Sequence, residues 1–461
     1  MDKTNYLTVR EIYEGVVGKT IQDDSPVEID GWVINNRFMG KMGFISFNDG
    51  TCFKNAQLVY SDDNKDFAAL EALRLGASIS IKGNVKLTPE AKQPFEIHLA
   101  SFFLYGDVDD SYPLQKKKTS FDYLRTIPHL RPRTNTFRAV FRVRSVLSMA
   151  IHEFFQGEGF IYVHTPILTS NDAEGAGATF QVASDISHPE EYFGKKVTLT
   201  VSGQLHVEPF CMAYRDVYTF GPTFRAEKST TTHHAAEFWM IEPEIAFADI
   251  YDDMDLIQDF LKYIVKYVMA NCPDEIDFFD QFVEKGLKKR LQDFVDKPFT
   301  QVSYTDAIEL LLKAKKDGHV FKNDNIFWGL DLESEHERYL TEEIFKGPIF
   351  LTDYPKEIKS FYMKQNPDGK TVAAVDLLVP EIGELVGGSE READYDKLLK
   401  RMQELKMNIP TYQWYLDLRR YGTCPHAGFG LGFERMMQFV TGMANIRDVE
   451  AYPRTFKECD F

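Results

Sequence analysis

The sequence contains few cysteines, and they are scattered. The 461-residue chain has five, an odd number, and no CxxC pair occurs among them. A zinc knuckle or a disulfide network is therefore not expected, and reduced, packed cysteines are. The chain also lacks any apolar run near the ~18 residues that would cross a membrane.

The first residues show no targeting segment, and the chain has no internal repeat or low-complexity tract. MDKTNYLTVREIYEG carries acidic residues early and has neither an apolar signal core nor an Arg-rich transit pattern. We therefore expect a cytoplasmic protein. A chain of this length is expected to form two or three domains.

Basic residues are outnumbered: 53 Lys and Arg stand against 70 Asp and Glu, a formal net charge of −17. Taken alone, this balance argues against a nucleic-acid partner, but binding depends on local rather than total charge. Residues 115–144 hold nine Lys and Arg against one acid, Asp122. This segment is either a solvated linker or a track along which a polyanion is held.

Residues 1–105 predict a small barrel. Between the third and fourth of its expected strands, Lys65–Leu75 has helical spacing. Five strands with a helix after the third follow the order of an OB-fold, a common oligonucleotide-binding barrel, although five strands also build other small barrels. The expected strands are rich in Val, Ile and Phe with partial alternation: Val27–Asn35, Gly43–Asn48, Asn55–Tyr60, Ala77–Leu87 and Phe95–Leu104.

The remaining sequence predicts a linker and a larger α+β domain. Residues 106–135 are polar, basic and interrupted by proline, as is typical of a hinge. Residues 136–461 mix strands and helices, and 251–345 looks like a largely helical insertion between two strand-rich halves. An amphipathic helix is expected from Phe137, with one apolar face made of Val140, Val143, Leu147, Ala150, Ile151 and Phe154.

Three segments, in this order, carry the chemistry. They are the helix–strand–proline unit at 137–166, FGPTFRAEKSTTTHHAAEFWMIEPE at 220–244, and GFGLGFER at 428–435. Together they resemble the three-motif pattern of class II aminoacyl-tRNA synthetases, and the resemblance covers essentially the whole chain. It implies an antiparallel sheet flanked by helices, and a homodimer formed through 137–166. GFGLGF is not a dinucleotide loop, because it lacks the G-x-G-x-x-G spacing.

Amino-acid activation brings two anions together, a carboxylate and the α-phosphate of ATP, so the site must supply fixed positive charge. Arginine suits this task because it is always charged and binds either group through two parallel donors. Arg225 follows a run of apolar and small residues, and Arg435 follows a strand with alternate glycines that leaves room for a flat ligand. The resemblance assigns Arg225 to the α-phosphate and the amino-acid carboxylate. It assigns Arg435 to the γ-phosphate and the adenine face, and both arginines to catalysis.

The resemblance implies further contacts with Mg·ATP. Phe238 would stack on adenine opposite Arg435, and His234 would reach the γ-phosphate. Asp376 and Glu384 are identified as the Mg²⁺ ligands, hard oxygen donors that connect metal and phosphates.

Two positions depart from the pattern of the relatives. Gly387 stands where aspartate-specific relatives often have serine, and His233 stands where close relatives often have arginine. If that arginine touches phosphate, His233 would do so with only part of its charge near neutral pH.

Amino-acid recognition requires an anion for the α-ammonium group. The resemblance assigns this task to Glu174, on a loop that Gly175 and Gly177 could hinge. Ser202 and Gln204 in VSGQLHVE match the amino-acid-pocket strand, and Arg391 matches the arginine that holds the side-chain carbonyl oxygen. Glu227 is an acceptor either for adenine or for the substrate's side-chain NH₂ group.

The segment SGQLHVE also indicates whether the substrate is asparagine or aspartate. The aspartyl pattern SxQLYKQ has a lysine that neutralises the substrate carboxylate, and Val207 takes its place in SGQLHVE. Burying an unpaired carboxylate is costly, so a valine-lined pocket favours the neutral amide. YPKEIKSFYMK, AEFWMIEPE and TGMANIRDVEAYPRT also resemble asparaginyl enzymes. The expected partners are L-asparagine, ATP and tRNA(Asn).

Three alternatives stay open: an aspartyl enzyme, a paralogue that makes asparagine by amidating aspartyl-adenylate, and a non-catalytic RNA-binding paralogue. The N-terminal barrel argues against the second, since that chemistry needs no anticodon reader. Retention of Arg225, Glu384 and Arg435 argues against the third.

In the barrel, the resemblance implies an anticodon site. Phe44, Gln57 and Glu96 match positions that hold the middle anticodon base. An aromatic ring offers a stacking face, while Gln and Glu address a Watson–Crick edge.

Overall fold

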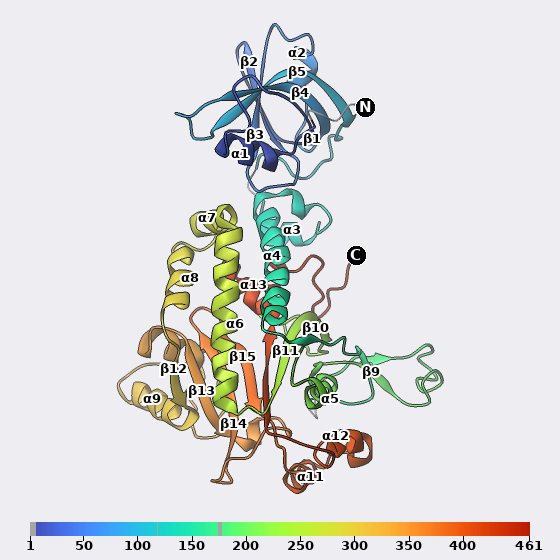
Figure 1. Cartoon of the computed structure of the whole chain (residues 1–461), viewed down its shortest axis with the longest axis vertical. Helices are drawn as coiled ribbons and strands as arrows, with labels where there is room; N and C mark the ends of the chain where they lie inside the picture. The colour runs from blue at the N-terminus through green and yellow to red at the C-terminus, as the bar shows by residue number, and fades with distance from the viewer. Residues whose placement is uncertain (1–5, 118, 174–177) are drawn as a thin grey trace. The chain divides into compact units, whose positions relative to one another are not determined.

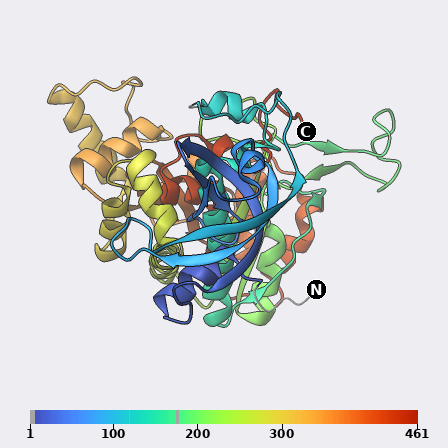
Figure 2. The same cartoon turned by 90° about the horizontal axis from the view of Figure 1, so that it is seen from above.

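The computed structural model describes residues 6–117, 119–173 and 178–461 of the chain. It divides into two compact units, Met1–Ala139 and Val140–Phe461. Figures 1 and 2 show a strand-built first unit and a second unit in which helices flank a larger sheet. Among the described residues, no helix is both long enough and apolar enough to span a membrane.

The first unit is a closed five-stranded barrel with strand order β1-β2-β3-β5-β4, which confirms the predicted OB-fold. Alternate residues of each strand enter one core, as Val27, Ile29 and Val33 do in β1. The predicted helix is the short α2 (Phe67–Glu71). The strands are β1 (Pro26–Met39), β2 (Met42–Asn48), β3 (Ala56–Ser61), β4 (Ser78–Leu87) and β5 (Phe95–Gly106).

An additional helix, α1 (Val9–Val17), precedes the barrel and was not predicted from the sequence. A capping box starts it, in which Thr8 and Glu11 exchange side-chain and backbone hydrogen bonds. Its buried residues Val9 and Ile12 join the barrel core. After the barrel, the basic segment contains short helical turns, α3 (Phe121–Arg125) and η1 (Arg131–Arg133).

The second unit is built on an eight-stranded sheet with the order β12-β13-β14-β15-β16-β11-β10-β6. Neighbouring strands are antiparallel except at β12–β13 and β10–β6, which are parallel. The strands are β6 (Ile161–Tyr162), β10 (Asp216–Phe224), β11 (Glu237–Ala246), β12 (Thr300–Ser303), β13 (Ile349–Pro355), β14 (Thr371–Val379), β15 (Gly383–Glu390) and β16 (His426–Gly432). The segment 251–345, which the sequence suggested is a largely helical insertion, contributes β12 to this sheet.

Helices and a small second sheet surround the large sheet. Helix α6 (Ile250–Asn271) packs on β14, β15 and β16, and the centroids of the Phe260 and Phe429 rings lie 6.0 Å apart. The small sheet has the order β7 (Leu168–Thr169), β9 (Val197–Leu199), β8 (Gln181–Val182). The helices are α4 (Asn135–Gly157), α5 (Gln204–Tyr214), α6 (Ile250–Asn271), α7 (Pro273–Phe282), α8 (Leu287–Asp296), α9 (Tyr304–Lys316), α10 (Ser334–Arg338), α11 (Tyr395–Glu404), α12 (Gln413–Asp417) and α13 (Phe433–Thr441).

Helix α4 is amphipathic as predicted, but its apolar face is internal. Val140, Val143, Leu147, Ala150 and Ile151 are all completely buried within the chain. That face is therefore not a free surface on which a second copy could dock.

Candidate active site

The hairpin of β10 and β11 positions the first group of predicted residues. Its antiparallel register ends at Phe224 opposite Glu237, and Arg225 extends the pairing through a 3.0 Å hydrogen bond from its N–H to the carbonyl of Ala236. The Arg225 guanidinium carbon lies 5.4 Å from the centroid of the Phe238 ring. A cavity of about 130 Å³ opens here, hereafter the nucleotide cavity. Its lining includes Arg225, Glu227, His233, His234, Phe238, Glu384 and Arg435.

Arg435 and two histidines of the β10–β11 loop complete the lining of this cavity. Nη1 of Arg435, at the start of α13, donates to the carbonyl of Glu384 (2.9 Å) and lies 3.5 Å from its Oε2. Burial raises the pKa of the Glu384 carboxyl, but Arg435 and Lys359 outweigh burial and leave that pKa below its usual value. Burial also lowers the pKa of His233 and of His234, so both rings favour the neutral form.

The alternate glycines of β16 are not all open to a ligand. A Cβ atom at Gly428 would lie 2.7 Å from the Glu244 carboxylate, and one at Gly430 would lie 2.8 Å from Cε of Met240. The position at Gly428 is therefore closed, since the main-chain carbonyl of Pro243 would also collide with that Cβ atom, whereas at Gly430 the nearest atom is the end of a flexible side chain and the glycine still lines a cavity. At Gly432 the nearest atoms, on Arg435, are 3.9 Å away, so the open space is next to Arg435.

A second cavity of about 500 Å³, hereafter the amino-acid cavity, joins the first. Arg225, Met240, Glu384 and Gly430 line both. Its remaining polar lining includes Ser202, Gln204, Glu242, Lys359, Asp376 and Arg391. The structure therefore brings Arg225 and Glu384 to the junction of the two cavities.

Glu242 is a residue of this cavity that the sequence analysis missed. The Ser202 hydroxyl donates a short hydrogen bond to Oε1 of Glu242, and the Gly203 N–H donates to Oε2 at 2.8 Å. Burial raises the pKa of this carboxyl. Glu242 follows Phe238 and Met240 at two-residue steps along β11, so strand alternation places it on the same face and could have identified it.

Gln204 supplies an unpaired donor. The side chain is buried, and its Nε2 atom has no hydrogen-bond partner. Because an unmade hydrogen bond on a buried amide costs free energy, this atom is suited to an acceptor on a bound ligand.

Arg391 follows β15 and is held by its neighbours. Its guanidinium donates to both Glu244 oxygens (2.5 and 3.2 Å) and to the Ser389 hydroxyl (2.7 Å). Glu244 raises the pKa of this arginine despite its burial. Three of its five N–H groups are thus used within the protein, and the guanidinium is fixed at the cavity wall.

Asp376 in β14 and Glu384 in β15 lie on the same side of the sheet. A Cβ atom at Gly387 would be 3.4 Å from Oδ1 of Asp376 and 3.2 Å from Oε1 of Glu384. Both carboxylates therefore border the space that the missing side chain of Gly387 leaves, and two hard oxygen donors around such a space fit a divalent cation.

Lys359 was also missed by the sequence analysis. Its Nζ atom lies 2.5 Å from Oδ2 of Asp376 and 3.8 Å from the centroid of the Tyr354 ring. It lies in YPKEIKSFYMK, a segment noted in the sequence only for its resemblance to asparaginyl enzymes.

Val207 lies outside the pocket in which the sequence suggested it. SGQLHVE forms the start of α5 rather than a strand, and Val207 is completely buried in an apolar cluster with Val163, Cys211, Val217, Ala246 and Cys424. Val207 is not among the described residues that line the amino-acid cavity. Glu227 lines the nucleotide cavity only. Glu174, with Gly175 and Gly177, lies outside the described residues.

In the barrel, Phe44, Gln57 and Glu96 lie on the neighbouring strands β2, β3 and β5. All three are half-buried, and Nε2 of Gln57 donates to Oε1 of Glu96 at 2.6 Å. Phe44 alternates with the core residues Ile45 and Phe47, so its ring is on the outer side of the barrel wall.

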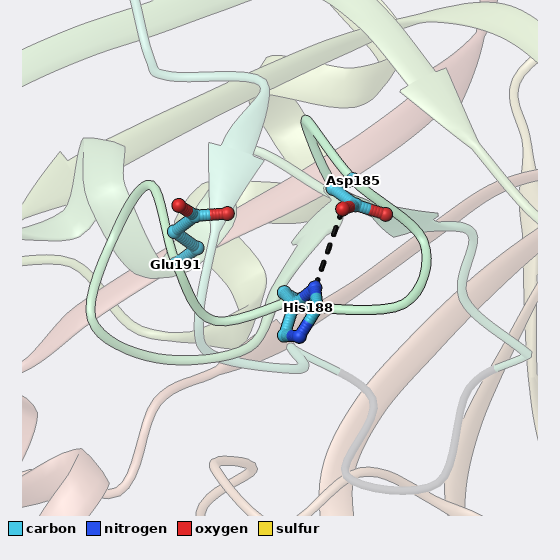
Figure 3. Close-up of side chains that lie close together, drawn as sticks. All are labelled: Asp185, His188 and Glu191. Carbon is cyan, nitrogen blue, oxygen red and sulfur yellow. Dashed lines mark hydrogen bonds and ion pairs between the residues drawn. The ribbon is translucent and has the colours of Figure 1, made fainter.

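A further group of polar side chains has no connection with either cavity lining. Asp185, His188 and Glu191 bring one ligand atom each within 4.8 Å of one another on a loop, as Figure 3 shows. All three are exposed, and the 3.3 Å contact between His188 and Asp185 is a surface pair. Exposed groups of this kind are common without a metal, and we assign no site to them.

Comparisons with known proteins agree with this geometry. Residues 121–456 match the family described as tRNA synthetases class II (D, K and N), and residues 27–104 match the OB-fold nucleic acid binding domain. An asparagine–tRNA ligase of Clostridium beijerinckii is 55% identical over 93% of this chain and 94% of its own length. One of Desulfitobacterium hafniense is 52% identical over 97% of this chain and all of its own length.

Solved structures lead to the same family. The asparaginyl-tRNA synthetase of Pyrococcus horikoshii, complexed with asparaginyl-adenylate, superposes with a TM-score of 0.84 at 35% identity, covering 94% of this chain and 95% of that one. The Entamoeba histolytica enzyme, also with asparaginyl-adenylate, superposes with a TM-score of 0.82 at 26% identity, covering 95% of this chain and 97% of its own. These relatives favour an asparaginyl-tRNA synthetase over the two alternatives of an aspartyl-tRNA synthetase and an asparagine-synthesising paralogue. The chain belongs to the asparagine–tRNA ligases, within the class II aminoacyl-tRNA synthetases.

Proposed function

We propose that the two joined cavities carry out asparagine activation, with ATP in the nucleotide cavity and L-asparagine in the amino-acid cavity. The observation that supports this most directly is that Arg225 lines both. A carboxylate oxygen of asparagine attacks the α-phosphorus, and the bond to the bridging oxygen breaks so that pyrophosphate leaves. Arg225 offsets the negative charge of the two anions where they meet.

Phe238 and Arg435 hold the nucleotide. The adenine ring stacks on Phe238, and Arg435 covers its other face near the open space at Gly432. His234 and Glu227 lie near the phosphates and adenine, respectively. In the second step, the 3′-terminal ribose hydroxyl of tRNA(Asn) attacks the carbonyl carbon of the adenylate and AMP leaves. Catalysis in both steps rests on positioning and fixed charge.

Asparagine is recognised by groups of opposite polarity. Glu242, held by Ser202 and Gly203, accepts a hydrogen bond from the substrate's side-chain NH₂ group, while Arg391 donates to its side-chain carbonyl oxygen. Gln204, whose Nε2 is unpaired, donates to a substrate oxygen. If aspartate were bound, its side-chain carboxylate would face the Glu242 carboxylate and be repelled. The cavity therefore selects the side-chain amide of asparagine.

Mg²⁺ fits between Asp376 and Glu384, beside Gly387. When bound, it would neutralise charge on the phosphates. Glu174, outside the described residues, remains our candidate for the α-ammonium group of asparagine.

The barrel contributes tRNA recognition. We assign the middle anticodon base to Phe44, Gln57 and Glu96, with the ring as the stacking surface and the hydrogen-bonded Gln–Glu pair facing the base edge. Charging is expected in the cytoplasm, where tRNA is used in translation.

The active form is a homodimer, but not through the apolar face of α4. Apolar side chains exposed near that helix are the better surface: Met149, Ile161, Tyr162, Ile167 and Leu168. Ile161 and Tyr162 form β6, an edge strand of the large sheet, and exposed edges with apolar neighbours favour association. Sedimentation that gives a monomer at micromolar concentration would exclude this assembly.

The recognition scheme is tested with Glu242→Gln in asparagine-dependent ATP–pyrophosphate exchange. Loss of one hydrogen bond to a charged group should lower kcat/KM for asparagine by roughly 10- to 100-fold. Glu237→Gln, at the exposed start of the same strand, is the control. An unchanged asparagine kcat/KM in Glu242→Gln would show that Glu242 does not touch the substrate.

A further inference from the structure

A buried network of charged side chains lies beside the amino-acid cavity. Glu208 in α5 is completely buried, and its Oε1 accepts hydrogen bonds from Nη2 of Arg419 (2.6 Å) and Nε2 of His426 (2.7 Å). Its Oε2 accepts from the Tyr415 hydroxyl (2.6 Å). Burial alone would raise the pKa of Glu208, but Arg419 and His426 hold that pKa well below its usual value. The carboxylate is therefore ionised and fully bonded.

This network holds the main chain on both sides of Arg391. The N–H of Arg391 donates to the carbonyl of His426 at 2.9 Å. Nε of Arg419 donates to the carbonyl of Glu392, the next residue, at 2.8 Å. The Arg419 side chain and the main chain of His426, whose ring is held by Glu208, thus fix the backbone from which the Arg391 guanidinium reaches the cavity.

Glu208 also belongs to the helix that presents Gln204 to the cavity. Glu208 lies four residues after Gln204 on α5, so the two share one face of the helix. Gln204 lines the amino-acid cavity, whereas Glu208, Tyr415, Arg419 and His426 are absent from the described lining of both cavities. The network can therefore act on a substrate only through the residues it holds.

We infer that Glu208 is a positioning residue for asparagine recognition, which sets the geometry of Arg391 and Gln204 without touching the substrate. The inference rests on the proposed role of Arg391. Glu208 is absent from the described lining of both cavities, so it does not take part directly in the chemistry at the phosphates. Buried networks that are fully bonded make a site rigid, and small displacements of a binding group are costly.

The test uses matched hydroxyl deletions. Tyr415→Phe removes, from a completely buried tyrosine, the 2.6 Å hydrogen bond to Glu208 and the 3.1 Å bond that the hydroxyl accepts from Arg419. Tyr304→Phe serves as control, because it removes a 2.6 Å bond to the carbonyl of Leu330 and a 3.1 Å bond from the N–H of Gly329 from another completely buried tyrosine. Glu208→Gln keeps the shape and removes the charge. KM for asparagine and KM for ATP are measured separately in pyrophosphate exchange, together with the melting temperature.

We expect Glu208→Gln and Tyr415→Phe to raise KM for asparagine by about tenfold or more, as for outer partners that orient a ligand-binding side chain. KM for ATP should stay within about twofold, and Tyr304→Phe should change neither. A folded Tyr415→Phe enzyme with unchanged KM for asparagine would overturn the inference. Equal rises in both KM values would also overturn it, since they would indicate general loosening. Arg391→Lys tests the proposed role of Arg391 by itself: if this variant keeps its KM for asparagine, the recognition scheme fails whatever Glu208 does.

Discussion

The Nζ atom of Lys359 lies 2.5 Å from Oδ2 of Asp376, one of the two carboxylates that we assign to Mg²⁺. Both side chains line the amino-acid cavity. An ammonium group and a divalent cation placed at the same carboxylate compete for its charge. The lysine therefore neutralises Asp376 when no metal is bound, and it weakens the metal site.

Replacing Lys359 with methionine should tighten metal binding. If the competition is worth about 1 kcal/mol, the concentration of Mg²⁺ that gives half-maximal pyrophosphate exchange falls roughly fivefold. Direct Mn²⁺ titration monitored by electron paramagnetic resonance should show the same change. Lys364→Met, which breaks the ion pair of Lys364 with Glu390 outside the described cavity lining, is the control. Weaker Mn²⁺ binding in Lys359→Met would contradict this account.

Arg225→Ala should abolish adenylate formation and leave the fold intact. A fixed charge at the reacting phosphate is worth roughly 3–4 kcal/mol, so pyrophosphate exchange should fall by at least about 100-fold. Arg215→Ala should keep wild-type exchange, because this exposed arginine contacts Asp216 (3.7 Å) and the Phe247 ring (5.7 Å to its centroid) and lies outside the described lining of both cavities. Near-wild-type exchange by Arg225→Ala, at an unchanged melting temperature, would mean that the motif is misassigned.

Phe44→Ala should separate tRNA charging from amino-acid activation. Stacking of one base is worth roughly 1–3 kcal/mol, so kcat/KM for tRNA should fall by about 5- to 150-fold while pyrophosphate exchange is unchanged. Val17→Ala, an exposed change in α1 of the same unit, provides the comparison. If the barrel melts earlier and both activities fall together, Phe44 supports the fold instead of the RNA.

The sequence alone predicted those secondary-structure elements whose buried residues recur at a regular spacing. The barrel strands follow from alternation. Arg225, Phe238 and Arg435 were identified by the family resemblance of their segments, and the structure places all three around one cavity. Val207 was misplaced because SGQLHVE has no pattern that separates a strand from the first turn of a helix. Lys359 and the Glu208 network could not be predicted, since their partners are 17 to 218 residues away and meet only in the folded chain.

Asp253 in α6 predicts a pH-dependent loss of stability. The side chain is completely buried, neither oxygen has a hydrogen-bond partner, and burial raises the pKa of the carboxyl well above its usual value. Below about pH 4 both the folded and unfolded states are protonated at this residue, so it has no effect there. As the pH rises, the unfolded chain ionises first, and the folded state is destabilised until the pH passes the raised pKa.

Asp253→Asn should therefore raise the melting temperature, and by more at pH 8 than at pH 4.5. The carboxyl destabilises the folded state over the pH interval between its pKa in the unfolded chain and its raised pKa in the folded chain. Each pH unit of that interval corresponds to about 1.4 kcal/mol in the free energy of unfolding, which Asp253→Asn restores. Asp255→Asn, exposed on the same helix, should show no such difference between the two pH values. A melting temperature that Asp253→Asn lowers at both pH values would show that the carboxylate has a partner in solution.

The central claim is that the amino-acid cavity selects a neutral amide by its hydrogen-bond polarity. Asparagine and aspartate have nearly the same shape, so Glu242 and Arg391 must distinguish them by charge. The most direct measurement is ATP–pyrophosphate exchange by the wild-type enzyme with each amino acid in turn, purified free of the other. We expect kcat/KM for asparagine to exceed that for aspartate by at least about 1,000-fold, the discrimination typical of a buried polar mismatch. Equal exchange with both, or a preference for aspartate, would contradict the account.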